Sequence, residues 1–246
     1  MKSPHPEWIA PDWPAPANVK AFVTTRAGGV SEGRYASLNL GLRTDDDPRA
    51  AALNRERLCA TLPQQPKWLR QVHGASVVEA DDLATTPEAD AGVARRPHTV
   101  CAVLVADCVP VLLADRQGTT IAIAHAGWRG LAAGVVENTV SRMGRDPADV
   151  LAWLGPGIGP RAFEVGPEVR DAFVSGDAPA QAAFQPHAPG KWLADLFLLA
   201  RRRLARAGVD AVYGGGLCTY NDAQRFYSYR RDRVTGRMAA VIWRER

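Results

Sequence analysis

Three side chains that can bind a metal or act as catalysts follow apolar runs in this sequence. His125 ends one run and precedes Gly-Trp-Arg-Gly in IAIAHAGWRG, Cys108 follows another in VCAVLVADCVP, and His73 ends a third in RQVHG. Two imidazoles and one thiolate suit zinc, with a fourth position left for water or substrate. The same ligands suit copper in a trigonal site. A thiol beside an imidazole can also act as a nucleophile with its base.

The pairing of two of these residues can be predicted from a local turn. The segment DRQG, residues 115–118, separates the runs that carry Cys108 and His125 and is typical of a hairpin. A two-residue turn at its centre places position 125 opposite Cys108, whereas a bulge at the glycine shifts the pairing by one residue. Both registers bring the thiol and the imidazole to the same end of neighbouring strands. Only the first puts them directly on one face.

The sequence around Cys108, His73 and the remaining histidines allows less specific predictions. Pro110 cannot donate to a central ladder, so we expect an edge or a bulge at that end of its strand. Strand ends in open α/β sheets are common places for chemistry. The sequence gives no local restraint that would place His73 beside the other two. The remaining histidines lie in proline-flanked polar stretches and are expected at the surface: His5, His98 and His187.

Segments near the same residues offer groups that could bind substrate. Arg129 could hold a phosphate through two parallel hydrogen bonds, and Trp128 could form a wall of a pocket. The glycines around them would let a substrate approach closely. The loop GGVSEGRYASLNLG offers backbone N–H groups and Asn39 to an anion or to ribose hydroxyls. Arg70 is a further candidate, although strand alternation would direct it away from His73. The structural alternatives are that Trp128 packs in the core, that Arg129 forms an ion pair with a carboxylate, and that the glycine-rich loop is an ordinary surface loop.

The elements that must position these residues form a mixed pattern of strands and helices. We expect strands at the start of AFVTTRAGG and in residues 67–80, 99–127, 149–155, 210–220 and 237–243. We expect helices in residues 47–62, 130–142, 167–174 and 192–207. Because the two kinds of element do not alternate strictly, we predict one α/β domain with a mixed, partly antiparallel sheet over residues 19–246. Residues 1–18 are expected to form a loosely ordered lead-in.

Composition narrows the class of protein. The chain has 246 residues with 46% hydrophobic content, enough for one large domain or two small ones. The net charge is +4, with 30 basic against 26 acidic residues, which does not indicate nucleic-acid binding. The arginines at 201–203 and 206 fit a solvated helix face. No signal segment or membrane span is expected, and four cysteines without CxxC spacing predict a cytoplasmic protein with reduced thiols.

Six motifs between Ala21 and Trp243 carry a family resemblance. They are TTRAGGVSEGRYASLNLG, RQVHG, ADCVPVLL, HAGWRG, GPGIGPRAFEV and FYSYRRDRVTGRMAAVIW. Together they resemble the YfiH-like family, once described as laccases or multicopper polyphenol oxidases and now as purine nucleoside phosphorylases with adenosine deaminase activity. The resemblance implies a single-domain mixed-sheet α/β sandwich, similar to the Cys/His hydrolase domain of cytotoxic necrotizing factor. It also implies that His73, Cys108 and His125 are the metal-binding and catalytic residues.

The resemblance further predicts the reaction and its partners. Phosphate would cleave adenosine or inosine, with methylthioadenosine as another candidate, to free base and ribose 1-phosphate. Zinc is the expected metal and copper the alternative. A multicopper oxidase needs more histidines than the five present, and the methionines at 1, 143 and 238 lie outside the ligand motifs. The zinc deaminase pattern H-x-E…P-C-x-x-C is absent.

Other classes of function stay open on the residues alone. In a Cys/His hydrolase, Cys108 would be the nucleophile and His125 its base. A copper-dependent phenol oxidase and a metal-binding protein without turnover are the remaining alternatives. The sequence predicts neither the preferred nucleoside nor the oligomeric state.

Overall fold

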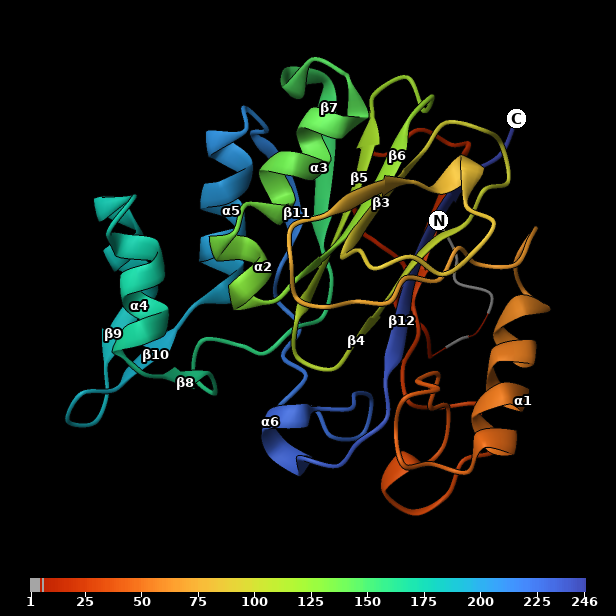
Figure 1. The fold of residues 1–246 in the computed structure, drawn as a ribbon, viewed down its shortest axis with the longest axis horizontal. Helices are drawn as coiled ribbons and strands as arrows, with labels where there is room; N and C mark the ends of the chain where they lie inside the picture. The colour runs from red at the N-terminus through yellow and green to blue at the C-terminus, as the bar shows by residue number, and fades with distance from the viewer. Residues whose placement is uncertain (1–4, 6) are drawn as a thin grey trace.

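Two β-sheets stacked face to face form the centre of the molecule (Figure 1). The computed structural model describes residue 5 and residues 7–246. The larger sheet has the strand order β11-β7-β5-β6-β3-β2, and the smaller has the order β1-β12-β4. The pairs β2–β3 and β7–β11 are parallel, and the other pairs within these two sheets are antiparallel. The predicted mixed-sheet α/β sandwich is therefore confirmed.

The strands of the large sheet are β2 (Val77–Glu79), β3 (Ala91–Ala94), β5 (Val109–Asp115), β6 (Ile121–Ala126), β7 (Val150–Leu154) and β11 (Ala211–Gly214). Those of the small sheet are β1 (Val19–Val23), β4 (Cys101–Val105) and β12 (Met238–Arg244). A third sheet of short strands consists of β8 (Glu164–Val165), β10 (Trp192–Ala194) and β9 (Phe184–Pro186).

The sequences of β5 and β6 are apolar at nearly every position, as expected for strands that are covered on both faces. Leu112 and Ile123 point toward the small sheet, whereas Val111 and Leu113 point toward the helices on the other side. Side chains alternate between faces along a strand, so a strand covered on both sides needs apolar residues at every position. These two strands form a rigid support for residues at their ends.

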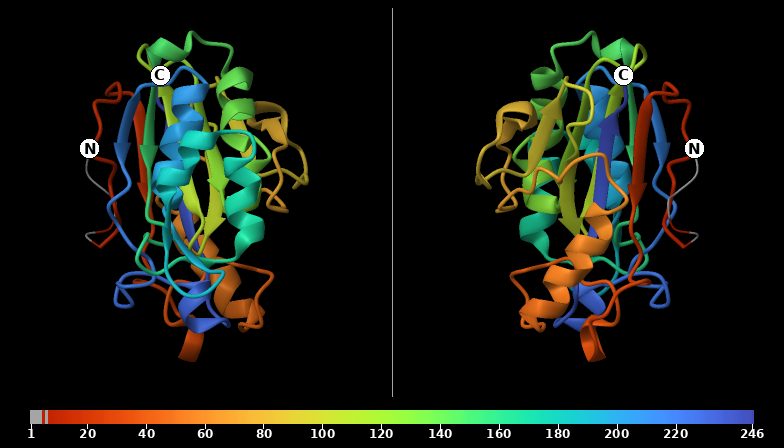
Figure 2. Two further views of the ribbon diagram at one scale, coloured as in Figure 1. Left: turned by 90° about the vertical axis from the view of Figure 1, so that its left-hand side faces the viewer. Right: turned by 90° about the vertical axis from the view of Figure 1, so that its right-hand side faces the viewer.

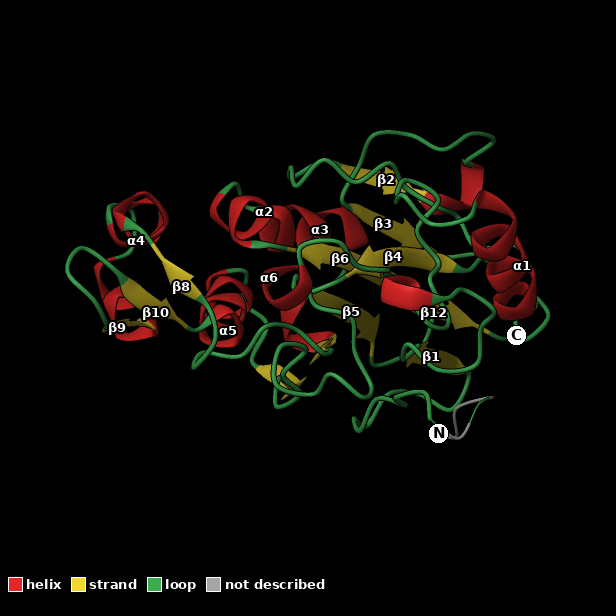
Figure 3. Cartoon of the chain, turned by 90° about the horizontal axis from the view of Figure 1, so that it is seen from below, coloured by secondary structure: helices red, strands yellow, loops and turns green. Residues whose placement is uncertain are grey.

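Helices cover the outer faces of both sheets (Figures 2 and 3). The large sheet is covered on the helix side by α2 (Trp128–Ala132), α3 (Val135–Met143) and α5 (Leu196–Arg206), and α4 (Pro167–Val174) packs against α2 and the third sheet. On the other side of the molecule, α1 (Pro48–Cys59) packs Leu58 against the small sheet, and the one-turn helix α6 (Tyr229–Asp232) precedes β12. Every helix among the described residues is too short or too polar to span a bilayer.

Local sequence signals explain where several helices begin and end. The side chain of Asp47 accepts a hydrogen bond from the backbone N–H of Arg49 and caps α1. The helix predicted over residues 130–142 is instead two helices, because Gly134 adopts a φ of 90° between them. The helix predicted over residues 192–207 begins only at Leu196, because the three residues before its Asp195 cap form β10.

The strand expected after residue 67 does not form. Residues 67–72 make isolated bridges through Lys67 to Cys101 and through Arg70 to Glu88, and only β2 remains of the predicted pair of strands. His73 therefore lies in a loop rather than at the end of a strand.

The hairpin between β5 and β6 has a register that neither predicted turn gives. Pro110 pairs with His125, so Cys108 lies opposite Gly127. The turn is longer than expected because the Asp115 carboxylate accepts hydrogen bonds from the backbone N–H groups of residues 119 and 120 and closes a wider loop. Cys108 still shares a face with His125, because it lies two residues from the partner of His125.

Pro110 lies in a central strand, contrary to the expectation of an edge or a bulge. Its carbonyl accepts a hydrogen bond from the N–H of Gly155 at 2.9 Å, and β7 ends at the residue before that glycine. The N–H that proline lacks would point toward the same side, where the ladder with β7 has already ended. The proline is tolerated for that reason.

The described part of the expected lead-in packs against β1. Trp8 stacks on Phe22 with 4.9 Å between ring centroids, and Ile9 forms an isolated bridge with Val23. Residues 1–4 and 6 of this segment lie outside the described part of the chain.

Candidate metal and catalytic site

His125 is fixed by its strand and by one carboxylate. It is the fifth residue of β6, and only 3% of its surface is exposed. Its Nδ1 lies 2.8 Å from Oδ1 of Asp90, and its backbone N–H donates to the carbonyl of the same residue at 2.7 Å. A carboxylate on Nδ1 selects the tautomer whose Nε2 is free to bind a metal or accept a proton.

Asp90 also holds the loop that carries His73. Its carboxylate accepts hydrogen bonds from the backbone N–H groups of Val72, His73 and Gly74, at 3.1, 3.0 and 2.8 Å. Burial raises the pKa of Asp90, but the hydrogen bonds from His125 and the loop outweigh it and lower the pKa below 3.8. One buried carboxylate therefore positions both histidines.

His73 adopts an uncommon backbone conformation. Its φ is 60°, in the left-handed region that non-glycine residues rarely occupy. The three hydrogen bonds to Asp90 maintain this turn, and the exposed imidazole packs edge-on against that of His125 with 4.9 Å between ring centroids. Such conformations cluster at functional sites, where the surrounding structure enforces them.

Cys108 is held at the start of β5 by a second buried carboxylate. The preceding residue, Asp107, has a φ of 96° and accepts hydrogen bonds from the Thr219 hydroxyl at 2.6 Å and from the Arg230 N–H at 2.7 Å. A Cβ added to Gly127 would lie 2.7 Å from Sγ of Cys108. The sequence predicts that the glycines of this motif admit substrate, and the missing side chain of Gly127 also makes room for the thiol.

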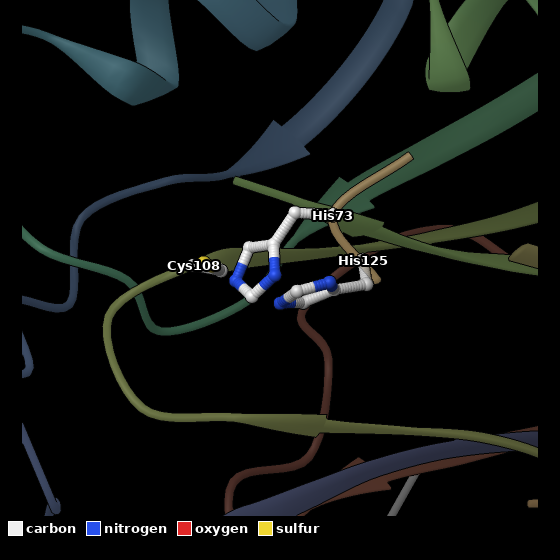
Figure 4. A group of neighbouring side chains, drawn as sticks. All are labelled: His73, Cys108 and His125. Atoms are coloured by element: carbon white, nitrogen blue, oxygen red, sulfur yellow. The ribbon is translucent and has the colours of Figure 1, made fainter. Parts of the chain in front are cut away.

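The three predicted ligands converge (Figure 4). One ligand atom from each of His73, Cys108 and His125 lies within 4.8 Å of the other two. Burial raises the pKa of Cys108, but the charge of His125 and hydrogen bonds with both imidazoles outweigh it and lower the pKa from 9.0 to about 6. Burial lowers the pKa of His125, but the Cys108 thiolate and Asp90 outweigh it and raise the pKa to about 9. The metal-free site thus favours a thiolate beside an imidazolium.

This set of donors fits a transition metal. Two nitrogens and one thiolate sulfur leave a fourth position open in a tetrahedral zinc site. A carboxylate behind a ligating imidazole is the usual outer partner in such sites, and Asp90 takes that place. In the described part of the chain, this is the one group of three or more His, Cys, Asp or Glu side chains arranged to hold an ion.

A cavity of about 820 Å³ opens beside these residues and is strongly cationic. Its lining includes six arginines and a single carboxylate: Arg43, Arg55, Arg129, Arg230, Arg233, Arg237 and Asp107. Among the described residues, none of the six arginines forms an ion pair, whereas many arginines elsewhere do. Unpaired cations around a cavity indicate an anionic ligand.

The predicted substrate-binding residues lie in different places. Arg129 lines the cavity, and its guanidinium lies 4.5 Å from the ring of Trp128, which also lines it. Asn39 is buried outside the cavity lining and donates hydrogen bonds to Thr44 and Asp46. Arg70 also lies outside the lining and forms an ion pair with Glu88.

The loop that contains Asn39 uses its polar groups internally. Ser31 donates to Asp46, Ser37 donates to the Arg26 carbonyl, and the Asn39 amide oxygen accepts from the backbone N–H of Arg237. Outside the site, His187 is exposed as expected, whereas His5 and His98 are half-buried.

Local reasoning missed several residues of the site. Asp90 lies outside the six motifs and Asp107 lies within ADCVPVLL, but no local pattern marks either carboxylate as part of the site. The arginines after residue 229 lie in the resembling segment FYSYRRDRVTGR, but no local pairing connects that segment to the histidines. The structure brings it to the cavity because β12 pairs with both β1 and β4.

Comparison with known proteins extends over nearly the whole chain. Residues 20–245 match the family described as "Multi-copper polyphenol oxidoreductase laccase". A purine nucleoside phosphorylase of Pseudomonas aeruginosa is 57% identical over 237 residues, covering 96% of this chain and 98% of that protein. Purine nucleoside phosphorylase YfiH of Escherichia coli is 54% identical with the same coverage.

Solved structures agree with the fold. The crystal structure of a Neisseria meningitidis protein is 50% identical, with a TM-score of 0.94 over 98% of this chain and all of that one. YlmD from Geobacillus stearothermophilus is 32% identical with a TM-score of 0.90, covering all of this chain and 98% of that one. The resemblance drawn from six motifs is confirmed by these comparisons: the chain belongs to the YfiH-like family of enzymes.

Proposed function

We propose that this protein is a purine nucleoside phosphorylase that also deaminates adenosine at the same site. It would cleave adenosine, inosine or methylthioadenosine with phosphate to free base and ribose 1-phosphate. The observation that carries the proposal is a cationic cavity that adjoins the converged His73, Cys108 and His125. The names of relatives at 57% and 54% identity support the same reaction.

The residues at this end of the cavity have roles that follow from their chemistry. Arg129 presents an exposed guanidinium suited to a phosphate, and half-buried Arg230 also lines the cavity. The ring of Trp128 offers a flat wall to a base or sugar. Holding phosphate against the sugar turns an encounter of two molecules into a step within one complex.

Zinc is the metal we propose for His73, Cys108 and His125, with copper as the alternative. When bound, zinc would act as a Lewis acid and lower the pKa of a bound water to about 7. The chain's own contribution is to fix the ligands: Asp90 orients His125 and the His73 loop, and Gly127 leaves space for the thiol.

A single cluster of ligands does not support the multicopper oxidase activity after which the family is described. The described residues hold one group suited to one ion, and the buried Met143 and Met238 do not line the cavity. A mononuclear hydrolytic or phosphorolytic site fits these residues better.

Product analysis with and without phosphate tests the proposal. Adenosine and inosine should yield adenine and hypoxanthine with ribose 1-phosphate only when phosphate is present. Deamination would give inosine from adenosine without any need for phosphate. Base release that is absent, or that does not depend on phosphate, would show that the phosphorylase assignment is wrong.

One observation favours a second candidate, a Cys/His hydrolase. Cys108, His125 and Asp90 form a thiol–imidazole–carboxylate chain in which the carboxylate orients the base. This is the arrangement of an activated nucleophile. Such an enzyme would cleave an amide or ester through a covalent adduct on Cys108.

Removal of metal separates the two candidates. A chelator should abolish phosphorolysis and deamination if the metal is required, and activity should return with added zinc. A thiol hydrolase should keep its activity in the chelator and lose it after alkylation of Cys108. Mass spectrometry of the alkylated protein identifies the modified residue.

A further inference from the structure

The cationic lining extends beyond the end of the cavity used by the proposed reaction. Arg43 and Arg55 line it from the side of α1, whereas Arg129 lines it from α2. The two helices pack against different sheets and lie well apart in Figures 1 and 3. The cavity therefore spans both layers of the molecule, with guanidinium groups at each end.

A single phosphate does not balance this charge. The six arginines outnumber the single lining carboxylate by five. That carboxylate, on Asp107, already accepts hydrogen bonds from Thr219 and from the Arg230 N–H. Orthophosphate near neutral pH contributes at most about two negative charges. A ligand that carries a second anionic group would compensate much of the remainder.

Arg55 is the best-defined cation at the α1 end. Its Nε donates to the Leu40 carbonyl at 2.8 Å, and its guanidinium lies 4.1 Å from the ring of Trp68. These contacts fix the plane of the group but leave its two terminal nitrogens without a hydrogen bond among those of the described residues. Burial lowers the pKa of Arg55 to about 10, with Cys59 opposing this effect and Arg43 adding a smaller contribution to it. Such a cation is costly without an anion beside it.

We propose that Arg55 and Arg43, beside Trp68, form a second anion-binding subsite that takes the 5′-phosphate of a nucleotide. The proposal rests on the proposed function in taking the ligand to be a purine nucleoside. If the reacting sugar carbon lies near Arg129 and His125, the 5′ carbon is the part of the sugar that extends away from the ring. A phosphate there could reach the α1 end, so nucleoside 5′-phosphates would be bound in preference to nucleosides.

Calorimetric titration of the full-length protein with adenosine and with adenosine 5′-phosphate tests the subsite without requiring turnover. We expect the 5′-phosphate to bind about tenfold more tightly, the effect of one charge-assisted hydrogen-bonded contact. Equal affinities would overturn the proposal. The titrations are repeated in saturating orthophosphate. A preference that persists supports a separate subsite, and one that disappears shows that the ester merely takes the place of orthophosphate.

Variants locate the subsite. Arg55→Met keeps an unbranched apolar side chain but removes the guanidinium that lies over Trp68, and it should reduce the ratio of the two affinities from about ten to about one. Exposed Arg43→Met should reduce it in part and is not expected to disturb folding. The matched control is Arg57→Met on the same helix, because Arg57 bonds to the Gly28 carbonyl outside the cavity and its loss should leave the ratio unchanged.

The outcomes separate this subsite from the proposed reaction. A folded Arg55→Met protein that keeps the full preference would overturn the location, with circular dichroism reporting the fold. If the parent protein releases no base from adenosine but shows a preference for the 5′-phosphate that depends on Arg55, the phosphorylase assignment fails and the subsite stands.

Discussion

The two ends of the cavity differ in how the protein treats its polar groups. At the histidine end, Asp90 alone accepts four hydrogen bonds, from His125 and from the N–H groups of residues 72–74. At the arginine end, near α1, the guanidinium groups of Arg43 and Arg55 have no carboxylate partner among the described residues. The first end is organised by the protein itself, whereas the second leaves its partners to be supplied by a ligand.

This difference suggests a division of labour. Groups that move protons or bind metal must be held in one geometry before substrate arrives, and buried, satisfied hydrogen bonds achieve that. Groups that bind an anion can keep their charge free for the ligand and pair with it only in the complex. Changes to the histidines, the thiol and their carboxylate partner should therefore act mainly on turnover or metal binding, and changes to the arginines of the cavity lining mainly on affinity.

Cys108→Ala should have the largest effect. We expect turnover to fall by more than about 1,000-fold, because the thiol is either a metal ligand or the nucleophile. The fold should survive, since Cys108 lies at a strand end and is only partly buried. Circular dichroism, bound-metal content and activity are compared with the parent. Full activity in a folded variant would refute both roles.

Asp90→Asn should have the next largest effect, although Asp90 touches neither metal nor substrate. The amide cannot accept all four hydrogen bonds, so both imidazoles lose their orientation. We expect zinc affinity to fall about 10- to 100-fold, the usual consequence of losing an outer partner of a ligand.

Competition with a chromophoric chelator measures this affinity directly. Asp149→Asn is the matched control, because its exposed carboxylate lies outside the site in the 3-10 turn before β7. Unchanged zinc affinity in folded Asp90→Asn would contradict the positioning role.

The pH dependence of thiol alkylation tests the electrostatics of the same end. With a pKa lowered from 9.0 to about 6, the Cys108 thiol in metal-free protein stays ionised above pH 6. Its alkylation rate should be half-maximal near pH 6 and about tenfold below its plateau at pH 5, because the thiolate is the reactive form. Peptide mass spectrometry follows the reaction at Cys108. Half-maximal alkylation near pH 9 would mean that the imidazoles do not stabilise the thiolate.

The fold was more predictable from the sequence than the site. Apolar runs placed β5 and β6 because both of their faces are buried. The register of their hairpin was not predictable from turn composition, because the Asp115 side chain closes a wider loop. The helix predicted over residues 130–142 is divided at Gly134, because the left-handed backbone conformation of this glycine interrupts the helix although the apolar residues keep helical spacing.

Non-local contacts account for what the sequence did not reveal at the site. The convergence of Cys108 and His125 could be predicted, because a hairpin joins them. The position of His73 depends on Asp90, which is 17 residues away. The arginines that line the cavity come from distant parts of the sequence. For example, a Cβ added to Gly41 would lie 2.9 Å from Cγ of Arg237. Neither contact leaves a local signal in one sequence.

Arg129→Met should selectively weaken phosphate binding, although Arg129 lines the cavity near the histidines. We expect the KM for phosphate to rise about tenfold with a smaller change in kcat, because one charged contact to the anion is lost. Arg49→Met is the matched control, since Arg49 is an exposed arginine on α1 outside the cavity. An unchanged KM for phosphate in the Arg129 variant would place the phosphate elsewhere in the cavity.

Arg70→Met should have the smallest effect, and it tests whether proximity in sequence to His73 matters. Arg70 was predicted as a substrate-binding residue, but it lies outside the cavity lining and forms an ion pair with Glu88. Both side chains are about half exposed, at 48% and 51%, so the solvent screens their attraction. We expect KM values for nucleoside and phosphate within about twofold of the parent, and a loss of stability below about 1 kcal/mol. Steady-state kinetics and urea unfolding measure the two quantities. A tenfold rise in either KM with unchanged stability would show that the binding surface extends beyond the cavity lining. It would also show that an arginine held in an ion pair takes part in substrate binding.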